Sequence, residues 1–200
     1  MKNLGFLMLL LAISALLSGN ALAQLPAQLI GGFDTTNSFG TYYSNANTAN
    51  APDATIRIMN TGGSLFAPDG NLYANIYVFD DSEELQECCS CLVTPDGLLS
   101  ESVNKNLTAN PLTGIKPQRG IIKILTADNG DPTQPVSLDI GLTGWATHIQ
   151  KGTSGFYGTE ASMHPLYLPG REAILLPQLC HFDALLSGKP CTCTPEDQDF

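Results

Sequence analysis

The sequence predicts a mainly antiparallel β-sandwich with one or two short helices, one of them near the C-terminus. Short segments of alternating polar and apolar residues recur along the chain, and turn-forming residues separate them. The segments leave no room for the several long amphipathic helices of a βαβ fold. Six cysteines in two distant groups add a covalent framework, which suits a protein outside the cytoplasm.

The first 23 residues have the pattern of a secretory signal peptide. Lys2 precedes an apolar run over residues 4–17, and a polar break leads to the small residues at 21–23. This order is typical of export and places cleavage after Ala23. The apolar run is short for an uncleaved membrane anchor, and no later segment is long and apolar enough to span a bilayer. We therefore expect an extracellular or periplasmic protein with no stable membrane span after cleavage.

The mature chain is acidic. Loss of residues 1–23 removes Lys2 and leaves 8 Lys and Arg residues against 19 Asp and Glu residues. A chain of this charge repels nucleic acid and anionic membrane surfaces, so we expect no nucleic-acid partner. The acidity favours solubility outside the cytoplasm, and cation binding by an acidic cluster is the alternative.

Residues 24–53 are expected to form an N-terminal arm ahead of a sandwich domain at 54–200. Small polar residues dominate positions 31–52, and they compete for the backbone hydrogen bonds that a helix needs. Scattered aromatic residues interrupt this composition at Phe33, Phe39, Tyr42 and Tyr43. The arm is either loose or an irregular edge strand that these aromatics anchor.

The strongest strand prediction is residues 71–80. Leu72, Ala74 and Ile76 share one face of this segment, while Tyr73 and Tyr77 lie on the other. Apolar residues on both faces indicate a central strand that is buried on both sides. Further strands are expected at 54–60, 92–93, 98–103, 120–125 and 136–150, and turn-rich separators include 151–158.

Helix is expected in two places. Residues 80–87 combine aspartates that can cap a helix with glutamates that suit its first turn. The acidic side chains of this segment form a solvated face, with cation binding as the alternative. The second helix begins near Gly170, is started or interrupted by Pro177, and is stopped by Gly188.

The six cysteines are predicted to form structural disulfides, because their number is even and the chain is exported. They are Cys88, Cys89, Cys91, Cys180, Cys191 and Cys193. A bond between adjacent residues, or across one residue, would be strained. On an extended segment Cys88 faces away from Cys89 and Cys91. We predict a Cys88–Cys180 bond, with the other four paired between the two groups in an order left open. A bond from Cys180 to Cys191 or Cys193 is the local alternative.

Redox and metal sites are the competing interpretations of these cysteines. Cys88 and Cys91 have the Cys-x-x-Cys spacing of a redox centre, but the acidic residues before them would raise the thiol pKa. The paired Cys-x-x-Cys knuckles of a zinc site are absent from the sequence. The pattern therefore favours disulfides, and we expect neither a metal nor a cofactor.

The block YANIYVFDDSEELQECCSCLVTPDGLL at 73–99, with the late LC…CTC, resembles an uncharacterised family of exported bacterial proteins. The resemblance extends over about half of the mature chain. It implies export and paired cysteine clusters, and it carries over no activity and no catalytic residue.

The chain shows no motif of a known catalytic site. His148, His164 and His181 lack the spacing of metal ligands, and there is no Gly-x-Ser-x-Gly elbow. Trp145, His148 and Tyr157 are weak ligand-site candidates, since exposed aromatics suit a glycan. Packing of Trp145 and its neighbours in the sandwich core is the favoured interpretation. We expect a non-enzymatic structural, adhesive or interaction module with a protein or glycan partner. A small secreted hydrolase without a visible motif, or a carbohydrate-binding module, is the alternative.

Overall fold

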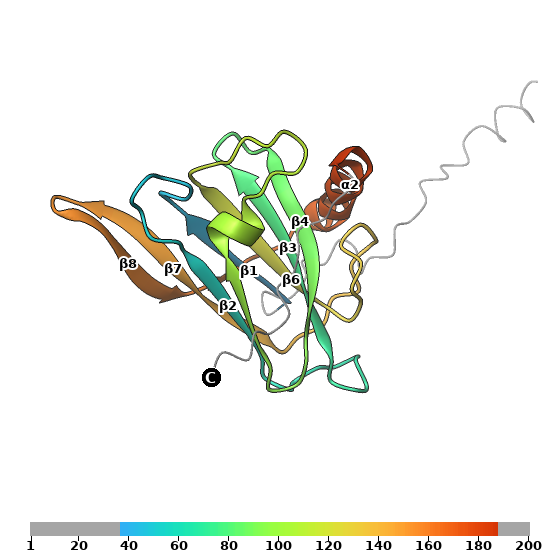
Figure 1. Ribbon diagram of the computed structural model, residues 1–200. Helices are drawn as coiled ribbons and strands as arrows, with labels where there is room; N and C mark the ends of the chain where they lie inside the picture. Colours follow the sequence, from blue (N-terminus) through green and yellow to red (C-terminus); the bar gives the residue numbers. More distant parts are fainter. Residues whose placement is uncertain (1–36, 188–200) are drawn as a thin grey trace, which may run out of the picture. The chain divides into compact units, whose positions relative to one another are not determined.

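Two antiparallel sheets pack face to face in the structure, a computed structural model that describes residues 37–187 (Figure 1). Sheet 1 has the order β4-β3-β6-β1-β9 and contains β1 (Ser38–Tyr43), β3 (Leu72–Asp80), β4 (Leu85–Val93), β6 (Gly120–Ala127) and β9 (His164–Pro165). Sheet 2 has the order β5-β2-β7-β8 and contains β2 (Thr55–Asn60), β5 (Leu98–Ser102), β7 (Leu142–Gly152) and β8 (Gly155–Ser162). The predicted β-sandwich is confirmed.

The core between the sheets is built from every second residue of their strands. Ile56 and Ile58 of β2 face Ile76 of β3 and Ile122 of β6, and all four are almost completely buried. Burial of one such side chain stabilises the fold by about 1.5–3 kcal/mol. The period-two alternation in the sequence therefore becomes the inner face of each sheet.

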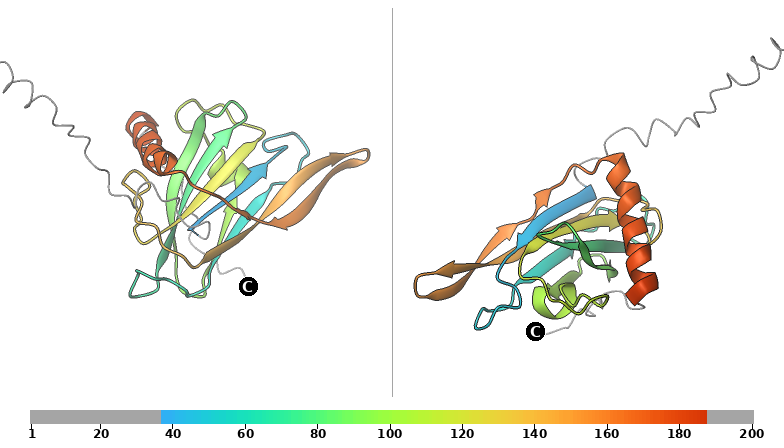
Figure 2. Two further views of the ribbon diagram at one scale, coloured as in Figure 1. Left: turned by 180° about the vertical axis from the view of Figure 1, so that it is seen from behind. Right: turned by 90° about the horizontal axis from the view of Figure 1, so that it is seen from above.

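Helix α2 (Gly170–Ser187) covers the other face of sheet 1, on the side away from sheet 2 (Figure 2). Tyr77 and Leu125 of the sheet form a second buried cluster with Leu176 of the helix. Strand β3 is therefore buried on both faces, as its two apolar faces predict. Pro177 lies inside α2 and does not interrupt it, although a proline removes one backbone hydrogen bond.

The prediction of a helix at 80–87 is wrong. These residues form the turn of the β3–β4 hairpin and the first paired residues of β4. Asp80 Oδ1 accepts hydrogen bonds from the backbone N–H groups of Ser82 and Glu84 at 2.9 and 3.0 Å. Glu83 has a φ of 66°, which no α-helix contains. An aspartate can cap a helix or close a turn, and here pairing of Leu85 with Phe79 decides for the turn.

Strand β8 is the longest element that the sequence does not predict. Residues 151–158 are predicted to be a turn-rich connection between strands, but β8 begins within them. Strand β7 starts at Leu142 rather than at residue 136, continues to Gly152, and turns back into β8. Most side chains of β8 are exposed, so the strand has no apolar alternation to reveal it. The strand predicted at 98–103 ends at Ser102, whose Oγ accepts from Lys105 N–H at the start of a π-helix, η3 (Val103–Leu107).

Part of the predicted arm is an ordered strand. Residues 38–43 form β1, which pairs with β6 along its whole length and with the two-residue β9 at Phe39 and Gly40. Phe39 and Tyr43 are buried, so two of the aromatics do anchor this segment. Residues 24–36 of the arm lie outside the described residues.

Candidate functional site

A groove with a volume of about 950 Å³ lies between the N-terminal half of α2 and the outer face of sheet 1. Apolar side chains that line it are Tyr42, Phe79, Ile121, Leu175, Leu176 and Leu179. Gly120 lies on the sheet side, where an added Cβ would approach the Phe79 carbonyl oxygen to 1.9 Å. This position therefore requires glycine, and the close approach of β3 and β6 beneath the groove depends on it.

Charged side chains surround the apolar lining. Arg119 Nε bonds Asp81 Oδ2 at 2.6 Å, and Lys123 Nζ pairs with Glu172. Arg171 also lines the groove and makes no ion pair with any residue in the described part of the chain. The groove thus combines an apolar lining with a charged rim, to which Asp80 and Glu83 contribute as well as Arg171.

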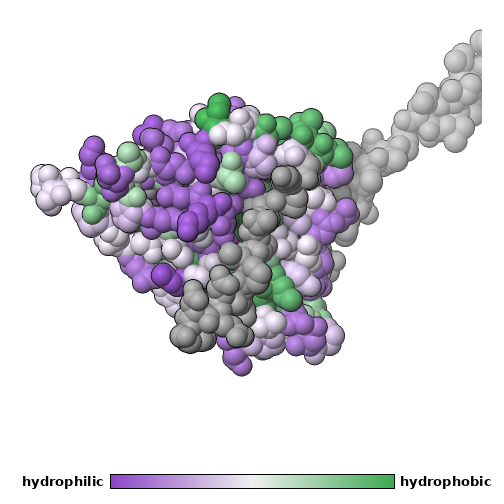
Figure 3. Space-filling view, viewed as in Figure 1, coloured by the Kyte–Doolittle hydropathy of each residue, from purple (hydrophilic) through white to green (hydrophobic). Residues whose placement is uncertain are grey.

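Helix α2 also exposes apolar side chains along its outward side. We call Ile174, Leu175, Phe182, Leu185 and Leu186 the outer stripe of α2. Phe182, Leu185 and Leu186 are exposed to 63%, 66% and 70%. Figure 3 shows strongly hydrophobic residues gathered over the position of α2. A helix that is apolar on all sides is usually buried on all sides, so the exposure of this stripe is unusual for a helix of this composition.

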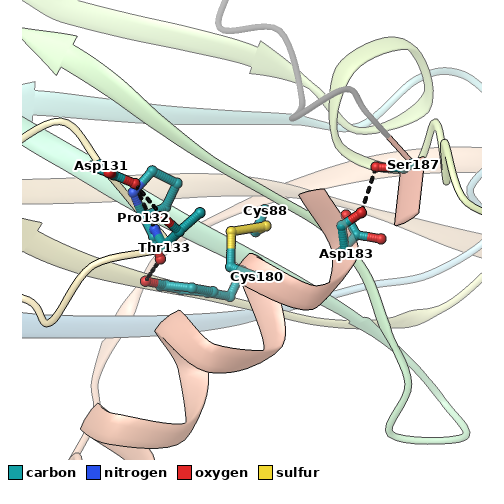
Figure 4. The surroundings of a disulfide bond; sticks show 8 residues. Cys88, Asp131, Pro132, Thr133, Cys180, Asp183 and Ser187 are labelled. Carbon is teal, nitrogen blue, oxygen red and sulfur yellow. Dashed lines mark hydrogen bonds between the residues drawn. A yellow bond between two sulfur atoms is a disulfide. The ribbon is translucent and has the colours of Figure 1, made fainter. Parts of the chain in front are cut away.

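The disulfide predicted between Cys88 and Cys180 is present, and it joins β4 to the middle of α2 (Figure 4). The two Cα atoms are 5.7 Å apart. Cys88 belongs to the cluster beneath α2, whereas Cys89 and Cys91 face the core between the sheets, so the predicted opposite directions of these side chains are present. Neither Cys89 nor Cys91 is a free thiol. Their predicted partners, Cys191 and Cys193, lie outside the described residues.

Two buried acids lie close to the disulfide. Glu87 precedes Cys88 and is 1% exposed, and its Oε2 accepts from the backbone N–H of Asn110 at 3.2 Å. Burial raises the pKa of Glu87 to about 7, and the charge of Asp183 adds to this shift. Asp183 lies on α2 beside the disulfide and is 6% exposed (Figure 4). Its carboxylate finds no hydrogen-bond partner in the described part of the chain, and burial raises its pKa as well.

His148 lies between the two sheets at the β1 edge. Its Nε2 is 2.9 Å from Thr41 Oγ1, and its ring centroid is 3.9 Å from that of Tyr42. Burial and then the neighbouring His164 lower the pKa of His148, so the ring is neutral at pH 7. A neutral imidazole in a hydrogen bond with a hydroxyl fixes the position of β7 against β1, which is a structural role.

The structure brings two of the three weak ligand-site candidates to one face of the β7–β8 hairpin. Tyr157 pairs with Gln150, and the Nε2 of Gln150 donates to the hydroxyl of Tyr42, which stacks on His148. Trp145 is three residues before His148 in the same strand and therefore points to the opposite face. The three residues do not form a common site. Trp145 is half-buried rather than part of the core.

The residues of the groove and of the outer stripe were not singled out as a site from the sequence. A signal was present, because residues 173–186 are rich in leucine and contain only one charged residue, Asp183. Across residues 37–187, no three histidine, cysteine, aspartate or glutamate side chains are grouped as a metal site requires. None of the helices that the structure describes is long and apolar enough to cross a membrane.

No protein-family model matches the chain, and no curated protein matches it significantly. Among solved structures, the crystal structure of Thermotoga maritima 1070 is similar to this chain, with a TM-score of 0.42 and 11% sequence identity. The match covers 68% of this chain and 98% of that chain.

Proposed function

We propose that this protein is an exported, non-enzymatic interaction module, in which a disulfide-linked β-sandwich presents α2 and its groove to a partner. The observation that carries the proposal is the outer stripe of α2 beside a preformed apolar groove. Contiguous exposed apolar surface on a soluble domain is typical of a binding site. The groove volume also falls within the usual range of about 300–1,000 Å³ for ligand sites.

The disulfide supports this proposal because it fixes the binding surface in advance. Cys180 lies between the groove-lining part of α2 and the C-terminal part that carries Phe182, Leu185 and Leu186. A helix that is held on its sheet loses less conformational freedom when a partner binds. The two acids with raised pKa values, Glu87 and Asp183, do not line the groove, which favours binding over catalysis there.

Export is part of the proposal and is supported by four features. Residues 1–23 have the pattern of a signal peptide, and the chain carries a net charge of −10. The Cys88–Cys180 bond is of a kind that persists in oxidising compartments. The resemblance of residues 73–99 to exported bacterial proteins supports export as well.

Binding of 8-anilinonaphthalene-1-sulfonate (ANS) tests the proposed surface. We expect the oxidised mature protein, at low concentration, to raise ANS fluorescence several-fold, because the dye binds exposed apolar surface. Leu175→Gln and Ile121→Gln should each remove more than half of this increase, since both side chains line the groove. The control is Leu65→Gln, a loop residue that is 65% exposed and absent from the groove lining. Equal fluorescence from all four proteins would overturn the proposal.

A further inference from the structure

We propose that the β7–β8 hairpin binds a neutral oligosaccharide through an exposed face that carries two tyrosines. We call Tyr42, His148, Gln150, Tyr157 and Thr159 the tyrosine face. Four of these residues belong to the hairpin, and Tyr42 contacts them from β1. The inference goes beyond the proposed function, which concerns α2 and its groove. Tyr42 also lines that groove, so the two sites adjoin.

The outer part of the hairpin extends beyond the rest of the two sheets (Figure 1). Strand β2 pairs with β7 only as far as Ala146, whereas β8 pairs with β7 as far as Gly152. Residues that pair across two antiparallel strands lie on the same face of the sheet. Tyr157, which pairs with Gln150, therefore lies on the face that Gln150 shares with His148. Tyr157 is 54% exposed, so a ligand can reach this face.

Both tyrosine rings are held in position. The ring of Tyr42 stacks on His148, and its hydroxyl accepts a hydrogen bond from Gln150 Nε2 at 2.9 Å. The ring of Tyr157 lies along the backbone of Gly152, where an added Cβ would be 3.2 Å from Tyr157 Cε1. Tyrosine offers a large contact area with few rotatable bonds, so fixed rings of this kind lose little conformational freedom on binding.

Two tyrosines beside an amide match the surface of a pyranose sugar. The faces of a pyranose ring present C–H groups, which pack against aromatic rings, and its edge presents hydroxyl groups, which need hydrogen-bonding partners. Gln150 gives one amide hydrogen to Tyr42, and a glutamine amide has a second hydrogen and an acceptor oxygen to offer a ligand. The tyrosine face thus supplies both kinds of contact.

The charges of the hairpin favour a neutral sugar. Its lysine and its glutamate, Lys151 and Glu160, lie on the opposite face. There Lys151 Nζ is 6.0 Å from the ring of Phe156, and Glu160 pairs with Arg57. On the tyrosine face, burial lowers the pKa of His148, so its ring is neutral at pH 7. An acidic glycan would find no cation on this face, and the net charge of −10 would repel it.

Affinity electrophoresis tests the inference. In native gels that contain dextran, galactomannan, xyloglucan or mixed-linkage β-glucan, we expect at least one polymer to slow the oxidised mature protein. Polygalacturonate, which is a polyanion, should not slow it. Tyr157→Ala should weaken binding at least about tenfold, whereas Tyr157→Phe should stay within about threefold of the wild type because it keeps the ring. Tyr157 is exposed, so neither change should unfold the domain.

Three control variants should bind the polysaccharide like the wild type. Trp145→Phe changes the opposite face of β7, and Tyr167→Ala removes a tyrosine that is 62% exposed and lies outside the hairpin. Leu175→Gln changes the groove. No retardation by any neutral polymer, or equal retardation of Tyr157→Ala and the wild type, would overturn the inference.

The groove variant separates this inference from the proposed function. Loss of polysaccharide binding in Leu175→Gln, with binding kept in Tyr157→Ala, would place the sugar in the groove and overturn the inference. Binding that depends on Tyr157, together with ANS fluorescence that Leu175→Gln leaves unchanged, would overturn the proposed function and support the inference.

Discussion

The double variant Cys88→Ala/Cys180→Ala should lose about 4 kcal/mol of unfolding free energy in urea denaturation of the oxidised mature protein. The bond joins residues with a sequence separation of 92, so it removes a large part of the conformational freedom of the unfolded chain. The effect would fall towards about 2 kcal/mol if disulfides between the remaining four cysteines already close most of this loop. Either value is a large share of the stability of a small domain, about 5–15 kcal/mol.

A double variant on the same two elements is the matched control for this prediction. Leu92 lies on β4, four residues after Cys88, and His181 lies on α2, directly after Cys180. Both side chains are exposed. Leu92→Ala/His181→Ala should change stability by less than about 1 kcal/mol, as is usual for surface positions. Mass mapping must show that the remaining cysteines keep their wild-type pairing. A cysteine variant as stable as the control would show that the bond does not hold α2 on the sheet.

The free energy of unfolding should fall by about 2.5 kcal/mol between pH 5 and pH 8 because of Glu87 alone. Its pKa in the folded protein is about 7 instead of the ordinary 4.5. Between these values the folded protein keeps a proton that the unfolded chain has released, so a rise in pH favours unfolding. The stabilisation is complete below pH 4.5 and is lost as the pH rises through 7. Asp183, whose pKa burial also raises, contributes in the same direction.

Glu87→Gln isolates this contribution. The amide oxygen of glutamine can still accept from the backbone N–H of Asn110, while the buried negative charge is removed. We expect the variant to have a larger free energy of unfolding than the wild type at pH 8. At pH 5 most of this difference in stability should disappear. The pH dependence of the wild type alone does not isolate Glu87, because burial lowers the pKa of His148. That shift makes the free energy of unfolding rise with pH, opposite to the effect of Glu87. Glu84→Gln, at an exposed position of the same hairpin, is the control. A pH-independent difference between wild type and Glu87→Gln would contradict the account.

The predictable parts of the fold are those where a local pattern and the tertiary packing agree. The two apolar faces of residues 72–80 predict a strand buried on both sides, and sheet 2 and α2 supply those two contacts. The spacing of Cys88, Cys89 and Cys91 likewise predicts opposite directions for their side chains. That direction selects Cys180 on α2 for Cys88 and leaves the other two facing the core.

The unpredicted parts depend on contacts between distant residues. Asp80 and its acidic neighbours suit a helix start and a hairpin turn equally well, and only the pairing of β3 with β4 decides between them. Strand β8 is held by its hydrogen bonds to β7 rather than by buried side chains. The contact of His148 with Thr41 joins residues 107 positions apart, so no local pattern contains it.

The outer stripe of α2 could not be predicted for a related reason. Residues 173–186 are apolar on every side, so their sequence predicts a helix without showing which side meets the sheet. Cys180 settles the orientation, because its bond to Cys88 turns Leu176 and Ala173 towards sheet 1. Phe182 and Leu185 are then left on the outward side.

Hydrogen–deuterium exchange of α2 tests most directly the central claim that this helix is a fixed part of the sandwich. In the oxidised wild-type protein we expect the amides of residues 174–186 to exchange nearly as slowly as those of β3. In Cys88→Ala/Cys180→Ala the same amides should exchange at least ten times faster, while β3 and β6 stay protected. Rapid exchange of α2 in the oxidised wild-type protein would contradict the account, because a helix that detaches freely presents no preformed surface.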